Sequence, residues 1–286
     1  MGNMKICVVG LGIIGGSMCM ALKRAGYTVA GWNRSPEPLE FALKNEIIDE
    51  KAVNFDEYEV LCVALPPEAT VKFINSTPFK DGAIVADICG VKKFIEDAVY
   101  SKPRNFRYVG CHPMAGKEVS GIVNACCDLF DKASMVITSD SRTDRKAIET
   151  VKKLTADMGF KYIVECTAEI HDKKIAYTSQ LAHIVSNAYV KDDDIDCCLG
   201  FTGGSFQDMT RIAGVDEEVW SSLYLLNAEN LSKKIGGLIS SLQHIKNEID
   251  CGNSDALKCL LSDGRKRFES YKKITSSPDI SVLKLK

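Results

Sequence analysis

The chain has 286 residues, of which 45% are hydrophobic and 26% are charged, and its formal net charge is −2. A chain of this length exceeds the usual size of one hydrophobic core, so we expect two domains. The small net charge provides no general attraction to nucleic acid or to an anionic membrane surface, and neither is expected as a partner.

Short strands and helices alternate from residue 5 to about residue 166. The predicted strands are Ile6–Val9, Thr28–Trp32, Val60–Ala64, Ala83–Ile88, Tyr108–Cys111, Ser134–Thr138 and Lys161–Val164. The predicted helices between them are Ser17–Ala25, Glu37–Asn45, Pro67–Ile74, Val91–Tyr100 and Asp144–Met158. Such alternation is typical of a doubly wound parallel α/β sheet with right-handed crossovers. The sequence therefore predicts a Rossmann-type domain over residues 1–166.

The pattern changes after Thr167, where runs of β-branched residues become rare. Long helical patterns follow at Ala168–Val190, Glu217–Asn253 and Asp255–Lys273, and glycines mark the breaks between helices. We therefore expect a helical second domain over residues 167–286, so that the fold class is α/β followed by all-α.

Twelve cysteines are spread through the chain, several of them inside apolar segments such as ICVV and LCVAL. A thiol in such a segment behaves as a small hydrophobic side chain, and no Cys-x-x-Cys or metal-finger spacing occurs, so we expect no metal site. The sequence contains neither a signal peptide nor an apolar run of about 20 residues, and these features predict a cytoplasmic protein.

The first predicted strand runs into a glycine cluster, and a helical pattern follows. In this context Gly10 permits a tight turn, Gly12 allows a pyrophosphate to approach the backbone, and Gly15 allows the helix to pack on the strand. The alternative is a turn that needs glycine for structural reasons alone. We predict a dinucleotide site that includes Gly10, Gly12, Ile13, Ile14 and Gly15.

The end of the second predicted strand indicates which dinucleotide is bound. An acidic residue there would accept hydrogen bonds from the adenosine ribose, whereas this chain has Asn33, Arg34 and Ser35. An arginine between two neutral hydrogen-bonding side chains can hold a 2′-phosphate. The sequence therefore favours NADP as the cofactor, and the alternative is a solvated Arg34 with NAD bound equally well.

One of the four histidines, His112, directly follows a predicted strand. Ligands of open α/β sheets bind at the carboxyl ends of the strands, and histidine is a common proton acceptor near neutral pH. A nicotinamide that takes a hydride from a carbon bearing a hydroxyl needs such a group nearby. His112 is therefore the candidate catalytic residue, and the alternative is a loop histidine bonded to the backbone.

A polar stripe occurs on the first helix of the second domain. Ser179, His183 and Asn187 are spaced four residues apart and share one face of an otherwise apolar helix. The stripe either lines the cleft that faces the nicotinamide or makes hydrogen bonds between helices. His171 and Asp172, at the start of the same helix, are interpreted as capping and domain-contact residues.

Arg211 lies in a short apolar helical stretch after a glycine-rich break. An arginine keeps its charge and offers a fork that matches a carboxylate, so it is a candidate for binding an anionic substrate. An internal ion pair is the alternative.

Five segments together resemble the prephenate and arogenate dehydrogenase family of tyrosine biosynthesis over nearly the whole chain: GLGIIGGS, DICGVK, HPMAGKEVSG, HDKKIAYTSQLAH and FQDMTRIA. The resemblance implies an oxidative decarboxylation with NAD or NADP. A hydride leaves C4 of the substrate ring, carbon dioxide leaves C1, and the ring becomes aromatic. The resemblance also implies that the helical domain forms a homodimer.

The resemblance assigns roles to the candidate residues. It implies that His112 accepts a hydrogen bond from the C4 hydroxyl, that Arg211 binds a substrate carboxylate, and that His183 belongs to the substrate site. Ser179, on the face of His183, is expected to bind the substrate as well. The family contains both prephenate and arogenate dehydrogenases, and no residue that distinguishes the two substrates is evident, although prephenate is the main expectation.

One position departs from the family pattern. The family often has a serine in an Asp-x-x-Ser-x-Lys segment near the catalytic histidine, and this chain has Gly90 there. Cys89, a backbone N–H or a water molecule would have to supply the missing hydrogen bond. Lys92, two residues later, is interpreted as a surface charge at the start of a helix.

Two other functions agree with parts of the sequence. A hydroxyacid or imine-reducing dehydrogenase shares the two-domain plan, but we find no catalytic-lysine helix of the hydroxyacid type. A non-catalytic redox sensor that binds NAD(P) would need no proton acceptor beside the nicotinamide, whereas His112 is present.

Overall fold

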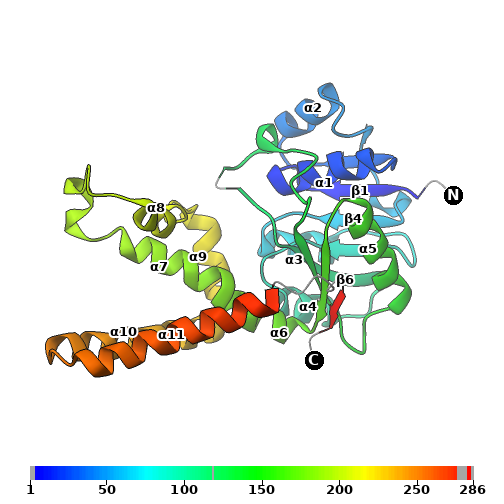
Figure 1. Cartoon of the computed structure of the whole chain (residues 1–286). Coiled ribbons are helices and arrows are strands. Elements are labelled where there is room, and N and C mark those ends of the chain that lie inside the picture. Colours follow the sequence, from blue (N-terminus) through cyan, green and yellow to red (C-terminus); the bar gives the residue numbers. More distant parts are fainter. Residues whose placement is uncertain (1–3, 118, 276–281, 285–286) are drawn as a thin grey trace.

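The structure is a computed structural model that describes residues 4–117, 119–275 and 282–284. Figure 1 shows a sheet covered by helices on both faces and a set of helices that projects away from it. The projecting helices follow the sheet in the chain, as the sequence predicts for an α/β domain followed by a helical one.

The described residues form one sheet of nine strands in the order β3-β2-β1-β4-β5-β6-β7-β8-β9. The strands are β1 (Ile6–Val9), β2 (Val29–Trp32), β3 (Glu50–Lys51), β4 (Val60–Val63), β5 (Ile84–Asp87), β6 (Arg107–Pro113), β7 (Ser134–Thr138), β8 (Tyr162–Cys166) and β9 (Val282–Lys284). Neighbouring strands are parallel except for the antiparallel pair β6 and β7. The predicted doubly wound sheet is confirmed, with one reversed step.

Five helices pack on the two faces of the sheet. They are α1 (Ile13–Arg24), α2 (Pro36–Lys44), α3 (Pro67–Ser76), α4 (Lys93–Tyr100) and α5 (Arg145–Asp157). Successive residues of a strand point to opposite faces, so Val8 joins one core with Met18 of α1, and Cys7 joins the other with Ile95 of α4. Helices α1, α2 and α5 therefore cover one face, while α3 and α4 cover the other.

A continuous helical run leaves the sheet and carries the polar stripe. It consists of α6 (Ala168–Ile175), the π-helical segment η3 (Ala176–Gln180) and α7 (Leu181–Tyr189), which confirms the predicted helix at Ala168–Val190. A π-helical turn adds one residue to the helical repeat and often occurs at functional sites. Short 3-10 turns elsewhere are η1 (Phe55–Glu57), η2 (Ile122–Asn124) and η4 (Asp193–Cys197).

The remaining helices are α8 (Gly204–Thr210), α9 (Glu217–Leu226), α10 (Ala228–Asp250) and α11 (Ser254–Thr275). The predicted single helix over Glu217–Asn253 is wrong at Asn227, where the chain bends between α9 and α10. The buried Asn227 amide donates to the backbone oxygen of Asp172 at 2.9 Å and to Gln180 Oε1 at 2.7 Å. These contacts with α6 and η3 hold the bend.

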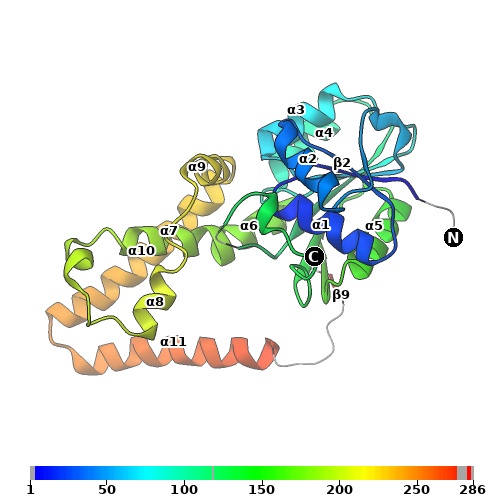
Figure 2. The ribbon, with the colours of Figure 1, turned by 90° about the horizontal axis from the view of Figure 1, so that it is seen from above.

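Helices α10 and α11 lie side by side and extend away from the sheet, as seen from above in Figure 2. The short strand β9 then pairs in parallel with β8 at the edge of the sheet. The sequence pattern does not predict this strand. No helix of the described residues has the length and apolar character needed to cross a membrane.

Candidate functional site

The glycine turn has the geometry that the sequence predicts. Gly10 has a φ of +96°, and its N–H donates to the backbone oxygen of Trp32 at 2.7 Å. A Cβ on Gly10 would lie 2.4 Å from the oxygen of Ala64, and a Cβ on Gly15 would lie 1.9 Å from the oxygen of Gly10. Both positions therefore require glycine, because the turn and helix α1 pack too closely for a side chain.

The start of α1 can accept an anion. Helix α1 begins at Ile13, its N-cap residue is Gly12, and no side chain caps it. The first turn contains no acidic residue, and a Cβ on Gly12 would meet nothing within 4 Å. The N–H groups of this turn and the positive end of the helix thus face open space, which fits the pyrophosphate of a dinucleotide.

At the end of β2, Asn33 makes hydrogen bonds that stabilise the fold, and the neighbouring Arg34 is exposed. Asn33 Oδ1 accepts a hydrogen bond from the Leu11 N–H at 3.0 Å, and Asn33 Nδ2 donates to the Ser35 oxygen at 3.1 Å. Asn33 therefore ties the glycine turn to β2 with both ends of its amide. Arg34 and Ser35 are exposed beyond it, where a ribose phosphate could approach them.

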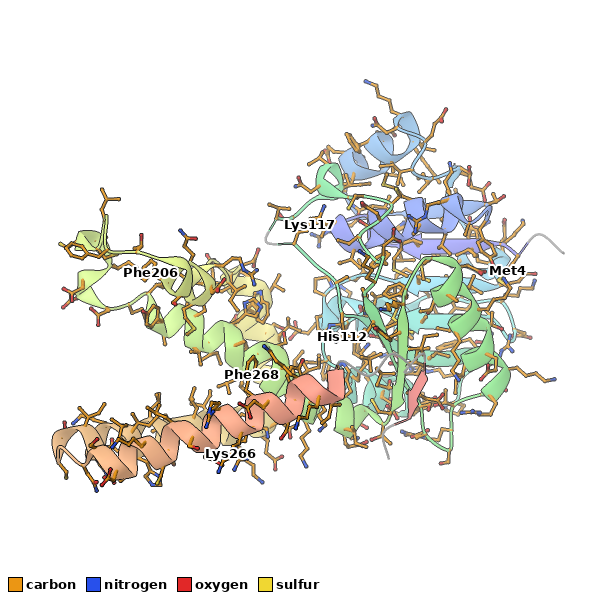
Figure 3. All side chains as sticks on the ribbon, viewed as in Figure 1. Met4, His112, Lys117, Phe206, Lys266 and Phe268 are labelled. Carbon is orange, nitrogen blue, oxygen red and sulfur yellow. The ribbon has the colours of Figure 1, made fainter. Side chains whose placement is uncertain are left out.

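A cavity of about 710 Å³ lies between the sheet and the helical domain. Its lining includes Gly90, His112 and Lys117 from the sheet side, and Ser179, His183, Asp216, Trp220 and Leu223 from the helical side. Figure 3 shows His112 and Lys117 on the part of the α/β domain that faces the helical domain. Three of the predicted site residues, His112, Ser179 and His183, thus meet around one space.

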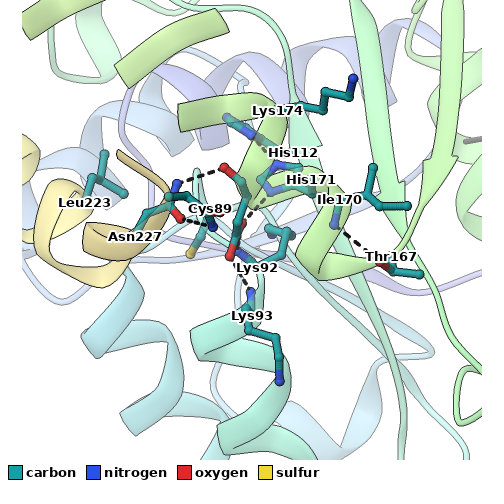
Figure 4. Close-up of polar contacts among 12 residues, drawn as sticks. Cys89, Lys92, Lys93, His112, Thr167, Ile170, His171, Lys174, Leu223 and Asn227 are labelled. Carbon is teal, nitrogen blue, oxygen red and sulfur yellow. Dashed lines mark hydrogen bonds and ion pairs between the residues drawn. The ribbon is translucent and has the colours of Figure 1, made fainter. Parts of the chain in front are cut away.

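His112 is the first member of a hydrogen-bonded chain of three side chains, drawn in Figure 4. Its Nδ1 lies 2.9 Å from Nε2 of His171, and Nδ1 of His171 lies 2.7 Å from Oδ1 of Asp172. His171 and Asp172 are buried in α6. The sequence interpretation of this pair as capping and domain-contact residues did not include the contact between His171 and the catalytic candidate.

The chain of contacts fixes the tautomer of His112. A carboxylate can only accept, so Nδ1 of His171 carries a proton that it donates to Asp172. Burial lowers the pKa of His171, so the ring is neutral and its Nε2 accepts. His112 must then donate from Nδ1. Its Nε2 is left as an acceptor, 3.7 Å from the position of a Cβ on Gly90 at the cavity wall.

Asp172 also connects the two domains. Its Oδ1 accepts from the Lys92 N–H at 2.9 Å, and its Oδ2 accepts from the Lys93 N–H at 3.0 Å. These are N–H groups at the start of α4, where the helix favours a negative charge. The predicted domain contact of Asp172 is therefore confirmed, whereas its own helix α6 is capped by Thr167 and Asp172 caps α4 instead. The contact with α4 holds the carboxylate that orients His171.

The protonation state of His112 follows from its surroundings. Burial lowers its pKa well below the usual 6.5, and the neighbouring His171 and Lys92 lower it further. His112 is therefore neutral at physiological pH and can accept a proton at Nε2.

A buried ion pair supports the strand end that carries His112. Lys92 is fully buried and donates to the Asp87 carboxylate and to the Cys111 oxygen, the latter at 2.5 Å. Asp87 also accepts from the Tyr108 hydroxyl at 2.6 Å and from the Cys89 N–H at 2.9 Å. The interpretation of Lys92 as a surface charge is wrong, because its side chain turns inward to hold the residue before His112.

Gly90 leaves space beside His112, and Cys89 does not fill the role of a hydroxyl there. The Cys89 thiol donates to the Leu65 oxygen at 3.2 Å and lies 3.3 Å from the Thr70 hydroxyl. A Cβ on Gly90 would be 3.7 Å from the His112 ring and 3.6 Å from Leu223. The backbone at Gly90 therefore has room for a Cβ in ordinary contact with His112 and Leu223, and Gly90 itself supplies no hydroxyl beside His112 Nε2.

The helical side presents a second oriented histidine. His183 Nδ1 donates to the Ile212 oxygen at 3.0 Å, and the ring packs on Trp220 with the centroids 3.9 Å apart. In the part of the chain that the structure describes, its Nε2 has no hydrogen-bond partner, and the ring lines the cavity. Asn187, the third residue of the stripe, donates to the Ala213 oxygen at 3.2 Å instead and does not line the cavity.

Arg211 does not join the cavity lining in the described part of the chain. It is exposed at the end of α8, while the next residue, Ile212, lines the cavity and holds His183. Helix α8 thus contributes backbone to the site, and the role of Arg211 as a substrate ligand stays a prediction.

Two family descriptions together match most of the chain. "Prephenate dehydrogenase, nucleotide-binding domain" matches residues 18–164, and "Prephenate dehydrogenase, dimerization domain" matches residues 167–263. The chain is 30% identical to a prephenate dehydrogenase of Lactococcus lactis over 277 residues, which cover 92% of this chain and 76% of the relative. It is 28% identical to a prephenate dehydrogenase of Bacillus subtilis over 274 residues, covering 90% of this chain and 74% of the relative.

Solved structures of similar proteins agree with the fold. Prephenate dehydrogenase from A. aeolicus, solved with hydroxyphenyl propionate and NAD+, has a TM-score of 0.80 and 28% identity, covering 94% of this chain and 99% of its own. Arogenate dehydrogenase from Synechocystis has a TM-score of 0.78 and 26% identity, covering 94% of this chain and 100% of its own.

Proposed function

Because the chain belongs to the prephenate dehydrogenase family of oxidoreductases, we propose that it converts prephenate to 4-hydroxyphenylpyruvate by oxidative decarboxylation. The observation that carries this proposal is the orientation of His112, whose Nε2 is an acceptor at the wall of the cavity between the two domains. Oxidation of a ring carbon that bears a hydroxyl requires a hydrogen-bond acceptor beside that hydroxyl, and His112 Nε2 is such an acceptor at the cavity.

The chemistry divides between the cofactor and the protein. A nicotinamide bound beside the cavity would accept the hydride from C4. His112 Nε2 accepts a hydrogen bond from the C4 hydroxyl and draws the proton toward itself as the hydride departs, which stabilises the positive charge that develops at C4. When the bond between C1 and the carboxylate breaks, its electron pair enters the ring. The hydroxyl then keeps its proton in the phenol that forms.

The residues around His112 make it ready for this role. Its neutral state leaves Nε2 free to accept, and the contacts with His171 and Asp172 keep the ring in the required tautomer. Positioned acid–base assistance of this kind contributes roughly 10²–10⁴-fold to a rate. Ser179 and His183 are proposed to bind the substrate from the other wall of the cavity.

We propose NADP as the preferred cofactor. The backbone around Gly12 and the start of α1 would hold the pyrophosphate, and Arg34 with Ser35 would hold the 2′-phosphate. The exposed guanidinium of Arg34 at the end of β2 and the absence of an acidic residue from the segment Asn33–Ser35 support this choice.

Arogenate is the second candidate substrate, and one observation favours it. Asp216 is the single carboxylate among the described residues that line the cavity. It caps α9 by accepting from the Val219 N–H at 2.9 Å and has a second oxygen that could accept from the ammonium of arogenate. Replacing Asp216 with Asn keeps a capping side chain and removes the charge. If arogenate is the substrate, this variant should lose activity toward arogenate and retain activity toward prephenate.

A homodimer is proposed as the working assembly. The helical domain matches a family description that names dimerization. Large apolar side chains are exposed on helices α9, α10 and α11, among them Leu225, Ile239, Leu242, Ile249, Leu261 and Phe268. A second copy of the chain would cover such residues. The free thiols of the twelve cysteines fit a reducing compartment, and we propose the cytoplasm.

The experiment that tests the function measures reduced nicotinamide with purified full-length protein. Prephenate and arogenate are each offered with NADP and with NAD. We expect the highest kcat/KM for prephenate with NADP. Cofactor binding without turnover of either ring substrate would contradict the proposal and would favour a redox sensor.

A further inference from the structure

The cavity contains an unassigned cation. Among the described residues that line it, Lys117 is the only lysine or arginine. It belongs to the exposed loop that follows β6, so it lies at the rim of the cavity, whereas His112 lies near the carboxyl end of β6. Figure 3 shows Lys117 on this loop, above His112 in that view.

The present partner of Lys117 is weak. Its ammonium donates to the Cys126 thiol at 3.1 Å, and sulfur is a poor acceptor compared with a carboxylate oxygen. Cys126 is held in turn, because its N–H donates to the Ser17 hydroxyl on α1 at 3.0 Å. The loop therefore keeps an ammonium near the cavity that has no carboxylate partner among the residues that the structure describes.

The proposed reaction, on which this inference rests, supplies an anion for that site. The ring substrate carries one carboxylate on C1, which leaves as carbon dioxide, and a second one on its side chain, which stays. A cation paired with the departing carboxylate would stabilise the substrate more than the transition state, in which that charge is being lost. A cation paired with the retained carboxylate stabilises the bound substrate and the transition state equally.

We propose that Lys117 binds the side-chain carboxylate of the substrate and thereby holds the ring with its C4 hydroxyl toward His112. The two residues lie on one segment of the chain, at the strand end and on the loop that follows it, so the same loop would set the distance between the carboxylate and the hydroxyl. Arg211, the cation predicted from the sequence, does not line the cavity in the described part of the chain.

The test compares two small ligands that differ by the carboxylate. 3-(4-Hydroxyphenyl)propionate has a phenol and one side-chain carboxylate, and 4-ethylphenol has the phenol alone. Their affinities are measured by calorimetry on the full-length protein saturated with NADP. The variants are Lys117→Met, Lys117→Arg as the conservative rescue, and Cys126→Ser as the control for the thiol contact.

We expect Lys117→Met to weaken binding of the propionate by about five- to tenfold, because the variant loses one ion pair at a solvent-exposed position. Binding of 4-ethylphenol should be unchanged, because this ligand has no carboxylate. Lys117→Arg and Cys126→Ser should bind the propionate within about twofold of the wild type, and KM for prephenate should rise in Lys117→Met while kcat is retained.

Equal losses for both ligands, or no loss for the propionate, would overturn the assignment of Lys117. Either result could accompany normal turnover of prephenate by the wild type, so the proposed function would then stand without this residue. A lower kcat at unchanged KM would also overturn it, because a group that binds the retained carboxylate acts on the ground state and the transition state alike.

Discussion

At the scale of single residues, the proposed role of His112 requires the neutral form of its ring. Its pKa lies below the usual 6.5 because the ring is buried, and the sign of the shift decides the pH dependence. A group whose neutral form is active and whose pKa is lowered keeps that form at lower pH. We expect kcat to stay constant from pH 8 to about 6.5 and to fall only below that range. A pH profile of kcat tests this, and a decline that begins above pH 7 would contradict it.

His171 should act on the rate through His112. Replacing His171 with Leu removes the acceptor of the His112 Nδ1 proton, so the ring can turn or change tautomer, and we expect kcat to fall by about 10²-fold. Gln at the same position offers an acceptor oxygen and should restore part of the loss. The control is KM for NADP, which should not change. Equal kcat values for the Leu and Gln variants would contradict a positioning role.

Arg34 decides the preference between cofactors in this account. Arg34→Ala should raise KM for NADP by about tenfold or more and leave KM for NAD nearly unchanged, because only NADP carries the 2′-phosphate. Lys44, at the exposed end of α2, offers a matched charge-removal control in Lys44→Ala. Equal effects of Arg34→Ala on both cofactors would remove the assignment.

Single residues were predictable from the sequence where the chemistry depends on a local motif. The glycine turn and His112 directly after a strand are of this kind, because the strand and turn fix their positions. The contact of His171 with His112 joins residues 59 positions apart and depends on how α6 meets the sheet. A His-Asp pair at a helix start was the available signal, and its partner could not be read from spacing.

At the scale of elements, strand β6 and helix α4 are held together by the buried Lys92. Replacing Lys92 with Met would leave the Asp87 carboxylate buried without its cation, which costs about 3–5 kcal/mol. We expect a clear drop in Tm for Lys92→Met. Lys93→Met is the matched control, since the Lys93 side chain is partly exposed and its ion pair with Asp97 is at the surface. Similar Tm values for both variants would contradict the role of Lys92.

The elements that the sequence predicts well are those with a regular local pattern. Strand β1 and strand β7 have the predicted bounds, Ile6–Val9 and Ser134–Thr138. The short edge strands β3 and β9 carry too few residues for a period of two to be recognised, and they form because a neighbouring strand offers its edge. The bend at Asn227 depends on partners in α6 and η3, so its sequence neighbours do not reveal it.

At the scale of the whole molecule, the site needs both domains, since the sheet supplies His112 and the helical domain supplies His171 and His183. The helical domain is also the proposed dimer interface. Leu242→Glu places a charge among the exposed apolar residues of α10, and we expect it to shift the protein from dimer to monomer. Val53→Glu, at an exposed position of the α/β domain, is the control and should remain dimeric. Sedimentation of both variants measures this, and a dimeric Leu242→Glu protein would contradict an interface there.

We propose above all that His112 assists oxidation of the carbon that bears the ring hydroxyl, in the cavity between the domains. The most direct test is the turnover of prephenate by His112→Asn, measured together with binding of NADP. We expect kcat to fall by about 10²–10⁴-fold while the affinity for NADP is unchanged, because the side chain acts on the hydroxyl and lies away from the glycine turn. Turnover close to that of the wild type would contradict the claim.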